Sequence, residues 1–417
     1  MKPRSYSDFI VAGKRQPPAA VFCSLLATVF GASATIGVAD RAARMGTPAF
    51  WWLAAGSLGL LAQGLFLARR IRELDADTLP DLAGKLAGRG GRWMVAGVVG
   101  VSWIGVVAAQ FAAAAQVLGW LWEPAGGAWG VAAVAAAVIA YTAAGGQVSV
   151  VRTDRWQFFL LAVALAALAA WMARTRPVGF RAGFELFNDA FPPRAWPGLA
   201  LTVGGAYLVG PDILSRTLLA RDAATARRSS LLAAPAVAAG GLLVTYIGVW
   251  TATLPGEGAP LSRLFAGGGL PGPLAVLAVA GLLAALVSSA DTCLVNAAAI
   301  WSHDLLGMRR VGAARALVAA IGLLALGLAL RGGDVIALLL SAYCVYTPGI
   351  VPPLVVALLA HPRWRARRPL WGAAVAAGSL PGAVHAICPA TPDWLPALGT
   401  ALSLSLALAS LRRARPD

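Results

Sequence analysis

The stretch "LLAALVSSADTCLVNAAAIW" (Leu282–Trp301) is an apolar run long enough to cross a bilayer as a helix, yet it holds two adjacent serines and an aspartate near its middle. An ionisable side chain at membrane depth costs at least about 2.5–3.5 kcal/mol, so it usually has a partner or a function. The run therefore predicts a membrane helix and a candidate functional site together.

The composition of the whole chain agrees with this interpretation. Of its 417 residues 59% are hydrophobic and 12% are charged, and the mean hydropathy is +0.73. A soluble protein of this length would carry about a quarter charged residues. Apolar runs of about 18 residues or more recur along the sequence, and each predicts a transmembrane helix. We expect an all-α polytopic membrane protein without a second domain outside the membrane.

The positions of the apolar runs predict about twelve spans. They lie near residues 18–39, 47–68, 93–122, 127–146, 155–173, 196–219, 230–253, 272–301, 312–330, 334–360, 369–387 and 394–411. With the N-terminus inside, the cytoplasmic segments hold 26 of the 34 Lys and Arg residues and the outer segments hold eight. Cytoplasmic loops of membrane proteins carry this excess, so both termini are expected in the cytoplasm. The net charge of +16 is then a feature of topology, and no nucleic-acid partner is expected.

The predicted spans show an internal symmetry. The first five (18–173) and the next five (196–360) form blocks of similar size, and an odd number of crossings inverts the second block relative to the first. The first helix of each block is interrupted by small residues, in "FGASATIG" (Phe30–Gly37) and "VGGAYLVGPD" (Val203–Asp212). Such matched interruptions point to a binding site near the bilayer midplane, although small residues also allow close helix packing. The expected parts are an N-terminal arm 1–17, the two repeats, an outer loop 174–195 between them, and 361–417 with two peripheral helices and a tail.

The serine pair offers oxygen ligands to a cation. On a helix Ala285, Ser288 and Ser289 share one face. A sodium ion takes about five or six hard oxygens, as other hard cations do, and the interrupted "GASATIG" segment could add freed carbonyls. Serines in membrane helices also bond back to carbonyls one turn earlier. The chemistry alone leaves both interpretations open.

Several motifs together resemble the sodium:solute symporter family, which has the LeuT-type fold. They occur in the family's order and cover roughly residues 8 to 360. The motifs are "DFIVAGKRQPP", "FGASATIGVADRAARMG", "TLPDLAGKLAGRGGR", "AYTAAGGQVSVVRTDRWQ", "GPDILSRTLLARDAATARR", "AALVSSADTCLVNAAAIWSHDL" and "TPGIVPPLVVALL".

The resemblance implies a ten-helix core of inverted repeats with two extra C-terminal helices, and sodium-coupled symport of a small organic solute by alternating access. It implies that Na⁺ is the coupling ion and that the protein is not an enzyme and has no catalytic residues. The implied sodium ligands are main-chain oxygens of Ala32, Thr35 and Ala285 and the hydroxyls of Ser288 and Ser289. Two departures stand out: the sequence starts at the lead-in to the first core helix, as in a short member lacking the usual first helix, and Ala34 replaces an aspartate found in the sodium/proline symporter.

The solute pocket is expected beside the two helix interruptions. Its candidate linings are polar, aromatic or small residues, for each of which a packing role is the alternative: Ser33, Gln63, Trp103, Gln110, Gly204, Tyr207, Ser341 and Tyr343. Asp154, in a predicted inner loop between Arg152 and Arg155, is a candidate gate. Asp212 and Arg216 are predicted to pair at i, i+4. Asp291 faces about 200° away from Ser289 and is either a structural group or a proton site.

Three alternatives remain at this point. One is a proton-coupled transporter of the same fold, with Asp291 or Asp40 titrating. Another is a membrane-embedded enzyme, which would need clustered acidic residues or a catalytic His that the sequence does not offer. A third is a transport-inactive solute sensor. The expected partners are a small-molecule solute and the lipid bilayer of a bacterial inner membrane, while the oligomeric state, a monomer included, stays open.

Overall fold

The protein is described by a computed structural model over residues 3–175, 184–255, 259–265, 269–332, 335–360, 364–388, 390–392 and 394–413. Parts of the predicted outer loop 174–195 and of the C-terminal region 361–417 lie outside these residues. Within them the chain is almost entirely helical, which confirms the predicted all-α membrane fold.

The elements of the N-terminal half run from the arm to the end of the fifth predicted span. They are α1 (Tyr6–Val11), η1 (Ala12–Lys14), α2 (Pro18–Val29), η2 (Ser33–Gly37), α3 (Val38–Met45), η3 (Thr47–Phe50), α4 (Trp51–Ala62), η4 (Gln63–Leu67), α5 (Ala68–Glu73), α6 (Leu79–Gly119), η5 (Glu123–Gly126) and α7 (Ala128–Thr175).

The C-terminal half adds the second set of membrane helices and one short strand pair. Its elements are η7 (Pro193–Ala195), α8 (Trp196–Leu199), η8 (Ala200–Gly204), α9 (Gly205–Val209), α10 (Pro211–Leu219), α11 (Ala223–Thr251), α12 (Pro260–Phe265), α13 (Gly272–Ala299), η9 (Ile300–Leu305), α14 (Val311–Ala329), α15 (Val335–Leu359), β1 (Trp364–Ala366), α16 (Arg368–Ile387), α17 (Leu395–Ser410) and β2 (Leu411–Arg413). Strands β1 and β2 pair antiparallel.

Nine helical segments of the described chain are long and apolar enough to cross a membrane, or ten when α2 and the bent η2–α3 segment count as one span. The predicted spans 127–146 and 155–173 both lie in α7, whose two helical parts meet at a kink at Gly146. Counting α7 twice and adding the 16-residue α17 accounts for all twelve predicted spans. The chain is an integral membrane protein.

Local sequence signals set where the helices begin. The Thr78 hydroxyl accepts the backbone N–H of Asp81 at 3.0 Å at the start of α6, and the Asp222 carboxylate accepts that of Thr225 at 2.6 Å at the start of α11. Proline follows directly at the first or second position of α2, α6, α10 and α13, where its missing N–H costs nothing.

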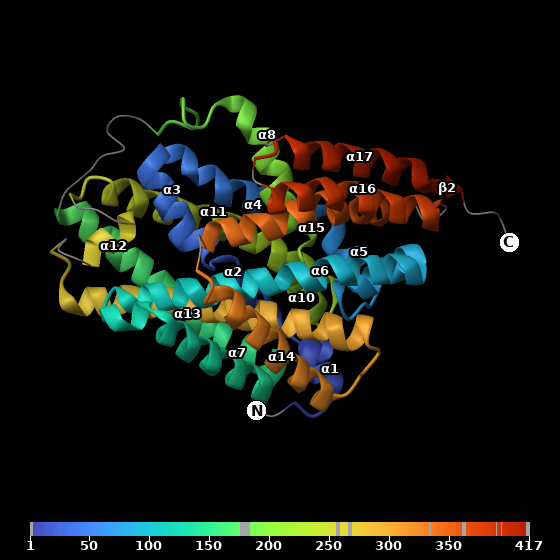
Figure 1. Ribbon diagram of the computed structural model, residues 1–417, viewed down its shortest axis with the longest axis horizontal. Helices are drawn as coiled ribbons and strands as arrows, with labels where there is room; N and C mark the ends of the chain where they lie inside the picture. Colours follow the sequence, from blue (N-terminus) through green and yellow to red (C-terminus); the bar gives the residue numbers. More distant parts are fainter. Residues whose placement is uncertain are drawn as a thin grey trace.

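Long helices from both halves pack against one another around the centre. Figure 1 shows α6 crossing the middle of the molecule, with α13 and α7 beneath it and α15 above it. Helix α13 packs against both α7 and α6, and α16 and α17 pack against α15 at the periphery. The buried core includes Trp103, Trp250 and Trp371.

Small residues bring the second and sixth spans into close contact. A Cβ added to Gly59 of α4 would lie 2.3 Å from the carbonyl oxygen of Gly204 in η8. Helix association in membranes depends on this kind of close packing, because lipid supplies no hydrophobic drive between helices. The contact holds the interrupted sixth span against the first repeat.

Gly146 is the point at which α7 changes direction. Its φ is +54°, and an added Cβ would lie 2.7 Å from both the backbone oxygen and the Cδ2 of Phe9 in α1. We expect Gly146→Ala to destabilise the protein by about 1–3 kcal/mol, because the substitution strains the backbone and displaces the N-terminal arm. Thermal unfolding in detergent would show a melting temperature lowered by several degrees.

Gly97→Ala in α6 is the matched control. Nothing lies within 4 Å of a Cβ at Gly97, and alanine favours a helix over glycine by about 0.5–1 kcal/mol. Equal melting temperatures for the two variants would contradict the assigned role of Gly146.

Candidate functional site

The first membrane helix is broken near its middle. Helix α2 ends at Val29, Phe30 leaves helical geometry with ψ of 45°, and the chain resumes as the π-helical turn η2. The two parts are bent by 61°. The interruption predicted from "FGASATIG" is therefore present.

The sixth span is broken as well. Helix α9 ends at Val209, Gly210 is extended with ψ of 145°, and α10 starts at Pro211. The Tyr346 hydroxyl donates to the freed carbonyl oxygen of Val209 at 2.9 Å. Beyond the break, Asn296 donates to the carbonyl oxygen of Pro211 in the first turn of α10 at 3.4 Å. The second predicted interruption is therefore also present, at Gly210 near the C-terminal end of the stretch Val203–Asp212.

Ser289 of α13 lies directly against the first break. Its hydroxyl donates to the carbonyl oxygen of Thr28 at 3.1 Å, and a Cβ on Gly31 would lie 2.6 Å from its Oγ. Thr35 donates its hydroxyl to the carbonyl oxygen of Gly31 at 2.8 Å. The backbone N–H of Ala32 donates to Oε1 of Gln110 at 3.1 Å. Several oxygens of the kind that a sodium ion binds thus converge on the break.

Ser288 faces another partner. Its hydroxyl donates to Oδ1 of Asp154 at 2.7 Å, and Ser24 of α2 also donates to this carboxylate. All five sodium ligands that the resemblance implies are buried. Ser289 contacts the first helix directly, Ser288 is linked to it through Asp154 and Ser24, and Ala285 lies one turn earlier on α13.

Asp154 lies in helix α7 and is completely buried, so the prediction of an inner loop at this position is wrong. The polar sequence "RTDR" resembled a loop, but only Asp154 of this stretch turns fully inward. Its charge is matched by Arg216 of α10, whose Nη2 lies 3.6 Å from Oδ2 of Asp154.

Arg216 is a buried residue whose role the sequence analysis missed. It donates from Nε to the Thr28 hydroxyl at 3.0 Å and from Nη2 to the Thr292 hydroxyl. The predicted i, i+4 ion pair of Asp212 with Arg216 is wrong, because the guanidinium turns toward Asp154 instead. An arginine inside an apolar run was the available signal.

Asp291 completes this polar group. Its Oδ1 accepts from the Thr292 hydroxyl at 3.4 Å, while its buried Oδ2 has no hydrogen-bond partner among the described residues. It does not contact Ser289 in any described hydrogen bond, in agreement with the opposite direction expected from helix geometry.

A small cavity lies between the two breaks. Five of the eight candidate pocket residues line it: Ser33, Trp103, Gln110, Tyr207 and Tyr343. The other three do not. Gln63 bonds to the Leu208 carbonyl and to the hydroxyls of Thr217 and Ser230, Gly204 packs against Gly59, and Ser341 lies outside the lining. The lining also includes Asp212 and Cys293, which the sequence analysis had not placed there.

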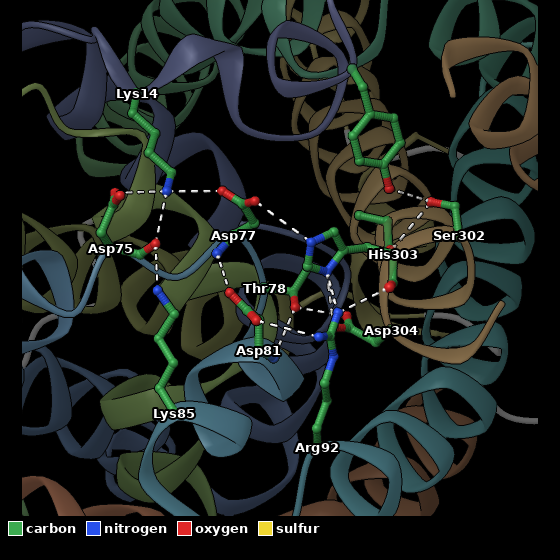
Figure 2. A network of polar contacts seen from close by, with 12 residues as sticks. Lys14, Asp75, Asp77, Thr78, Asp81, Lys85, Arg92, Ser302, His303 and Asp304 are labelled. Carbon is green, nitrogen blue, oxygen red and sulfur yellow. Dashed lines mark hydrogen bonds and ion pairs between the residues drawn. The ribbon is translucent and has the colours of Figure 1, made fainter. Parts of the chain in front are cut away.

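A second polar cluster lies in η9, the continuation of α13, and joins it to α6 (Figure 2). Arg92 of α6 donates to Oδ1 of Asp304 at 2.8 Å and to the backbone oxygen of His303 at 3.0 Å. Thr78 donates its hydroxyl to Asp304 at 2.7 Å, and Tyr6 of the N-terminal arm exchanges a 2.7 Å hydrogen bond with Ser302. We call these contacts, together with those of Lys14, the inner network.

Lys14 extends the inner network to the loop before α6. Its ammonium lies 2.8 Å from both Asp75 and Asp77. The hydrogen bond from Lys14 holds the pKa of Asp75 below its usual range, while burial raises the pKa of Tyr6 to about 12. Both shifts keep these groups in the charge states that the contacts require near neutral pH.

One triad in the inner network has the composition of a metal site. Ligand atoms of Asp81, His303 and Asp304 lie within 4.8 Å of one another. The Arg92 guanidinium already lies among them, 3.7 Å from Asp81, 2.8 Å from Nδ1 of His303 and 2.8 Å from Asp304. The positive charge that a metal would supply is thus provided by a side chain.

Comparisons with known proteins agree with the geometry. The model of the sodium:solute symporter family matches residues 9–258, more than half of the chain. A comparison with curated proteins finds no matching sequence. Among solved structures the chain is similar to a Na⁺-coupled sialic acid symporter in a substrate-bound outward-open state, with a TM-score of 0.78, 15% identity, and 99% of this chain and 94% of that chain covered.

Two further structures share the fold. A nucleobase-cation-symport-1 family transporter in a closed conformation has a TM-score of 0.61 and 16% identity, with 98% of this chain and 94% of that chain covered. MhsT in complex with L-phenylalanine has a TM-score of 0.60 and 16% identity, with 94% and 98% covered. These likenesses confirm the LeuT-type fold. The chain belongs to the sodium:solute symporter family.

Proposed function

We propose that this protein is a secondary active transporter that couples inward sodium flow to the uptake of a small organic solute by alternating access. The observation that supports it best is the contact of the Ser289 hydroxyl with the Thr28 carbonyl, which joins α13 to the broken first helix. In a chain of this family, a cation bound at that contact would connect the same two helices.

The proposed sodium ligands are the backbone oxygens of Ala32, Thr35 and Ala285 and the hydroxyls of Ser288 and Ser289. Both hydroxyls use their hydrogens elsewhere, Ser288 toward Asp154 and Ser289 toward the Thr28 carbonyl. A hydroxyl that donates its hydrogen still has lone pairs to offer. The hydrogen bonds therefore leave both serines able to bind a cation.

The nearby charges support a cation at this position. Asp154 adds a buried negative charge one hydrogen bond away from Ser288, and an attraction between charges is strong where water is excluded. Arg216 balances part of this charge through its ion pair with Asp154. A bound sodium ion would therefore add one positive charge beside the buried pair of Asp154 and Arg216.

Alternating access follows if sodium and solute favour the same conformation. Sodium would hold the first helix against α13 and stabilise a form that accepts solute between the two breaks. Its escape to the cytoplasm would free the first helix to move and release the solute. The inner network, which ties the end of α13 to α6, would have to open in that step.

Proton coupling through Asp291 is the second candidate, favoured by one observation. Its buried Oδ2 has no partner among the described residues, and a bound proton would remove the uncompensated charge. Sodium-independent, pH-dependent uptake would support this alternative. A solute sensor of the same fold would bind solute without flux.

We further propose that both termini are cytoplasmic and that the membrane is the inner membrane of a bacterium. The excess of Lys and Arg in the N-terminal arm and in alternate loops supports the orientation. The repeat boundaries 18–173 and 196–360 and the absence of enzymatic activity belong to the same proposal.

Sodium binding is testable without knowledge of the solute. A ligand that binds only the folded state stabilises it by RT ln(1 + [L]/Kd), so sodium at about ten times its Kd adds about 1.4 kcal/mol. We expect the purified protein to melt at a higher temperature in sodium chloride than in potassium chloride at equal ionic strength. Ser288→Ala and Ser289→Ala should each abolish the difference.

Ser229→Ala is the matched control. Ser229 is a buried serine of α11 that donates to the Pro18 carbonyl at 3.2 Å, away from the proposed ligands, so this variant should keep the sodium-specific shift. A wild-type protein with no sodium-specific shift but a shift with pH would contradict sodium coupling and favour Asp291.

The inner network should control access from the cytoplasm. Arg92→Gln leaves the buried Asp304 carboxylate without its cation, a change that costs up to about 3–5 kcal/mol when a pair is fully buried. We expect the variant to open more often toward the cytoplasm. Cys293, which lines the central cavity, should then react severalfold faster with a membrane-impermeant thiol reagent in inside-out vesicles, in a background without the other three cysteines.

Arg69→Gln provides the comparison, because Arg69 forms an exposed i, i+4 pair with Glu73 on the same stretch of chain. Exposed pairs of this kind contribute about 0–1 kcal/mol, so the Cys293 rate should not change. A similar acceleration in both variants would mean that lost surface charge, rather than the inner network, controls access.

A further inference from the structure

The central cavity has a negative wall. Asp212 is the one lining residue with a full charge among the described residues, and the rest of the lining is apolar, aromatic or neutral and polar. Its carboxylate forms no ion pair within the part of the chain that the structure describes. Arg216, one turn further along α10, turns its guanidinium away toward Thr28, Thr292 and Asp154.

The break in the sixth span determines the position of this carboxylate. Gly210 is extended, Pro211 begins α10, and Asp212 follows as the second residue of that nine-residue helix. A Cβ on Gly210 would lie 2.9 Å from Oδ1 of Asp212, so the carboxylate lies beside the break, where it borders the cavity.

The charges around the cavity do not balance. Three carboxylates, those of Asp154, Asp212 and Asp291, lie in or next to this region against the single guanidinium of Arg216. Asp154 has the Arg216 guanidinium as its partner, whereas the carboxylate of Asp212 has no ion-pair partner among the described residues. An uncompensated charge away from water is costly, so the carboxylate of Asp212 favours a cation in the cavity and disfavours an anion.

The rest of the wall suits an organic cation. Trp103, Tyr207 and Tyr343 line the same cavity, and aromatic faces attract ammonium groups within about 6 Å. Nε1 of Trp103 has no hydrogen-bond partner among the described residues, and it could donate a hydrogen bond to a neutral acceptor group of the bound cation.

We propose that the transported solute is a small organic cation, and that Asp212 binds its amine or quaternary ammonium group in the central cavity. This inference rests on the proposed transport function and names the substrate class for it. It separates the two negative sites by role: Asp154 acts beside the sodium ion, and Asp212 acts on the solute.

The charge preference of the cavity can be measured on the full-length protein. Cys293 lines the same cavity as Asp212, and in a background without the other three cysteines it reports on reagents that enter. The probes are 2-aminoethyl methanethiosulfonate, whose ammonium stands in for that of the solute, and the anionic 2-sulfonatoethyl methanethiosulfonate. Their rate ratio is compared with the ratio for a free thiol in the same buffer. Ser33→Cys, at a half-buried lining position, provides a second reporter.

We expect the ratio of the cationic to the anionic reaction rate to be roughly tenfold higher at Cys293 than for a free thiol. Asp212→Asn should remove this preference. Glu73→Gln, at the exposed ion pair with Arg69, should leave it unchanged. A ratio equal to that of a free thiol at both reporters, or one that Asp212→Asn does not alter, overturns the proposal.

The sodium-dependent melting shift, measured on the same variants, separates this inference from the proposed function. Asp212→Asn with an intact sodium shift and a lost cation preference supports Asp212 as the solute's partner. Loss of both would make Asp212 a sodium ligand and overturn the proposal. A cation preference without any sodium shift in the wild type would contradict sodium coupling and leave the assignment of Asp212 standing.

Discussion

The need to satisfy every backbone polar group inside the membrane governs the centre of this structure. A broken helix in hydrocarbon frees N–H and C=O groups that lipid cannot hydrogen-bond, so each break requires side chains from its neighbours. At the first break the Ser289 hydroxyl donates to the freed carbonyl of Thr28, and Oε1 of Gln110 accepts the freed N–H of Ala32. At the second break the Tyr346 hydroxyl donates to the freed carbonyl of Val209. Two of these side chains, Ser289 and Gln110, also line the central cavity.

The same constraint applies to charge. Asp154 and Arg216 are both fully buried, and neither would be stable alone, since an uncompensated buried charge costs several kcal/mol. The hydroxyls of Ser24 and Ser288 donate to Asp154, and those of Thr28 and Thr292 accept from Arg216, while Nη1 of Arg216 has no hydrogen-bond partner among the described residues. The pair connects α7 to α10, so it ties a helix of the first repeat to the broken helix of the second. A cation bound at Ser288 would change the field that this pair experiences.

The sequence alone predicted features that depend on local pattern and missed those that depend on contact between distant segments. Apolar runs gave the spans, and small residues gave both helix breaks. The pairing of Asp154 with Arg216 could not be predicted, because the two residues belong to different helices and their nearer neighbours in sequence suggested other partners. Asp154 was assigned to a loop because it lies between two arginines in a polar stretch. In the structure this stretch is helical, and Asp154 is its one fully buried residue. Asp212 was assigned to an ion pair by spacing, whereas the break at Gly210 places it beside the cavity.

Helix α13 physically connects the proposed cation site to the inner network. The segment from Gly272 to Leu305 runs through α13 into η9 without a break. Ser288 and Asp304 are 16 residues apart on it, a distance of about 24 Å at 1.5 Å per residue. A rigid helix of this length cannot shift at the serine pair without shifting at Asp304, where Arg92 and Thr78 hold it to α6. In the proposed mechanism, loss of the cation and opening of the inner network would therefore both move this helix, which would link ion release mechanically to solute release.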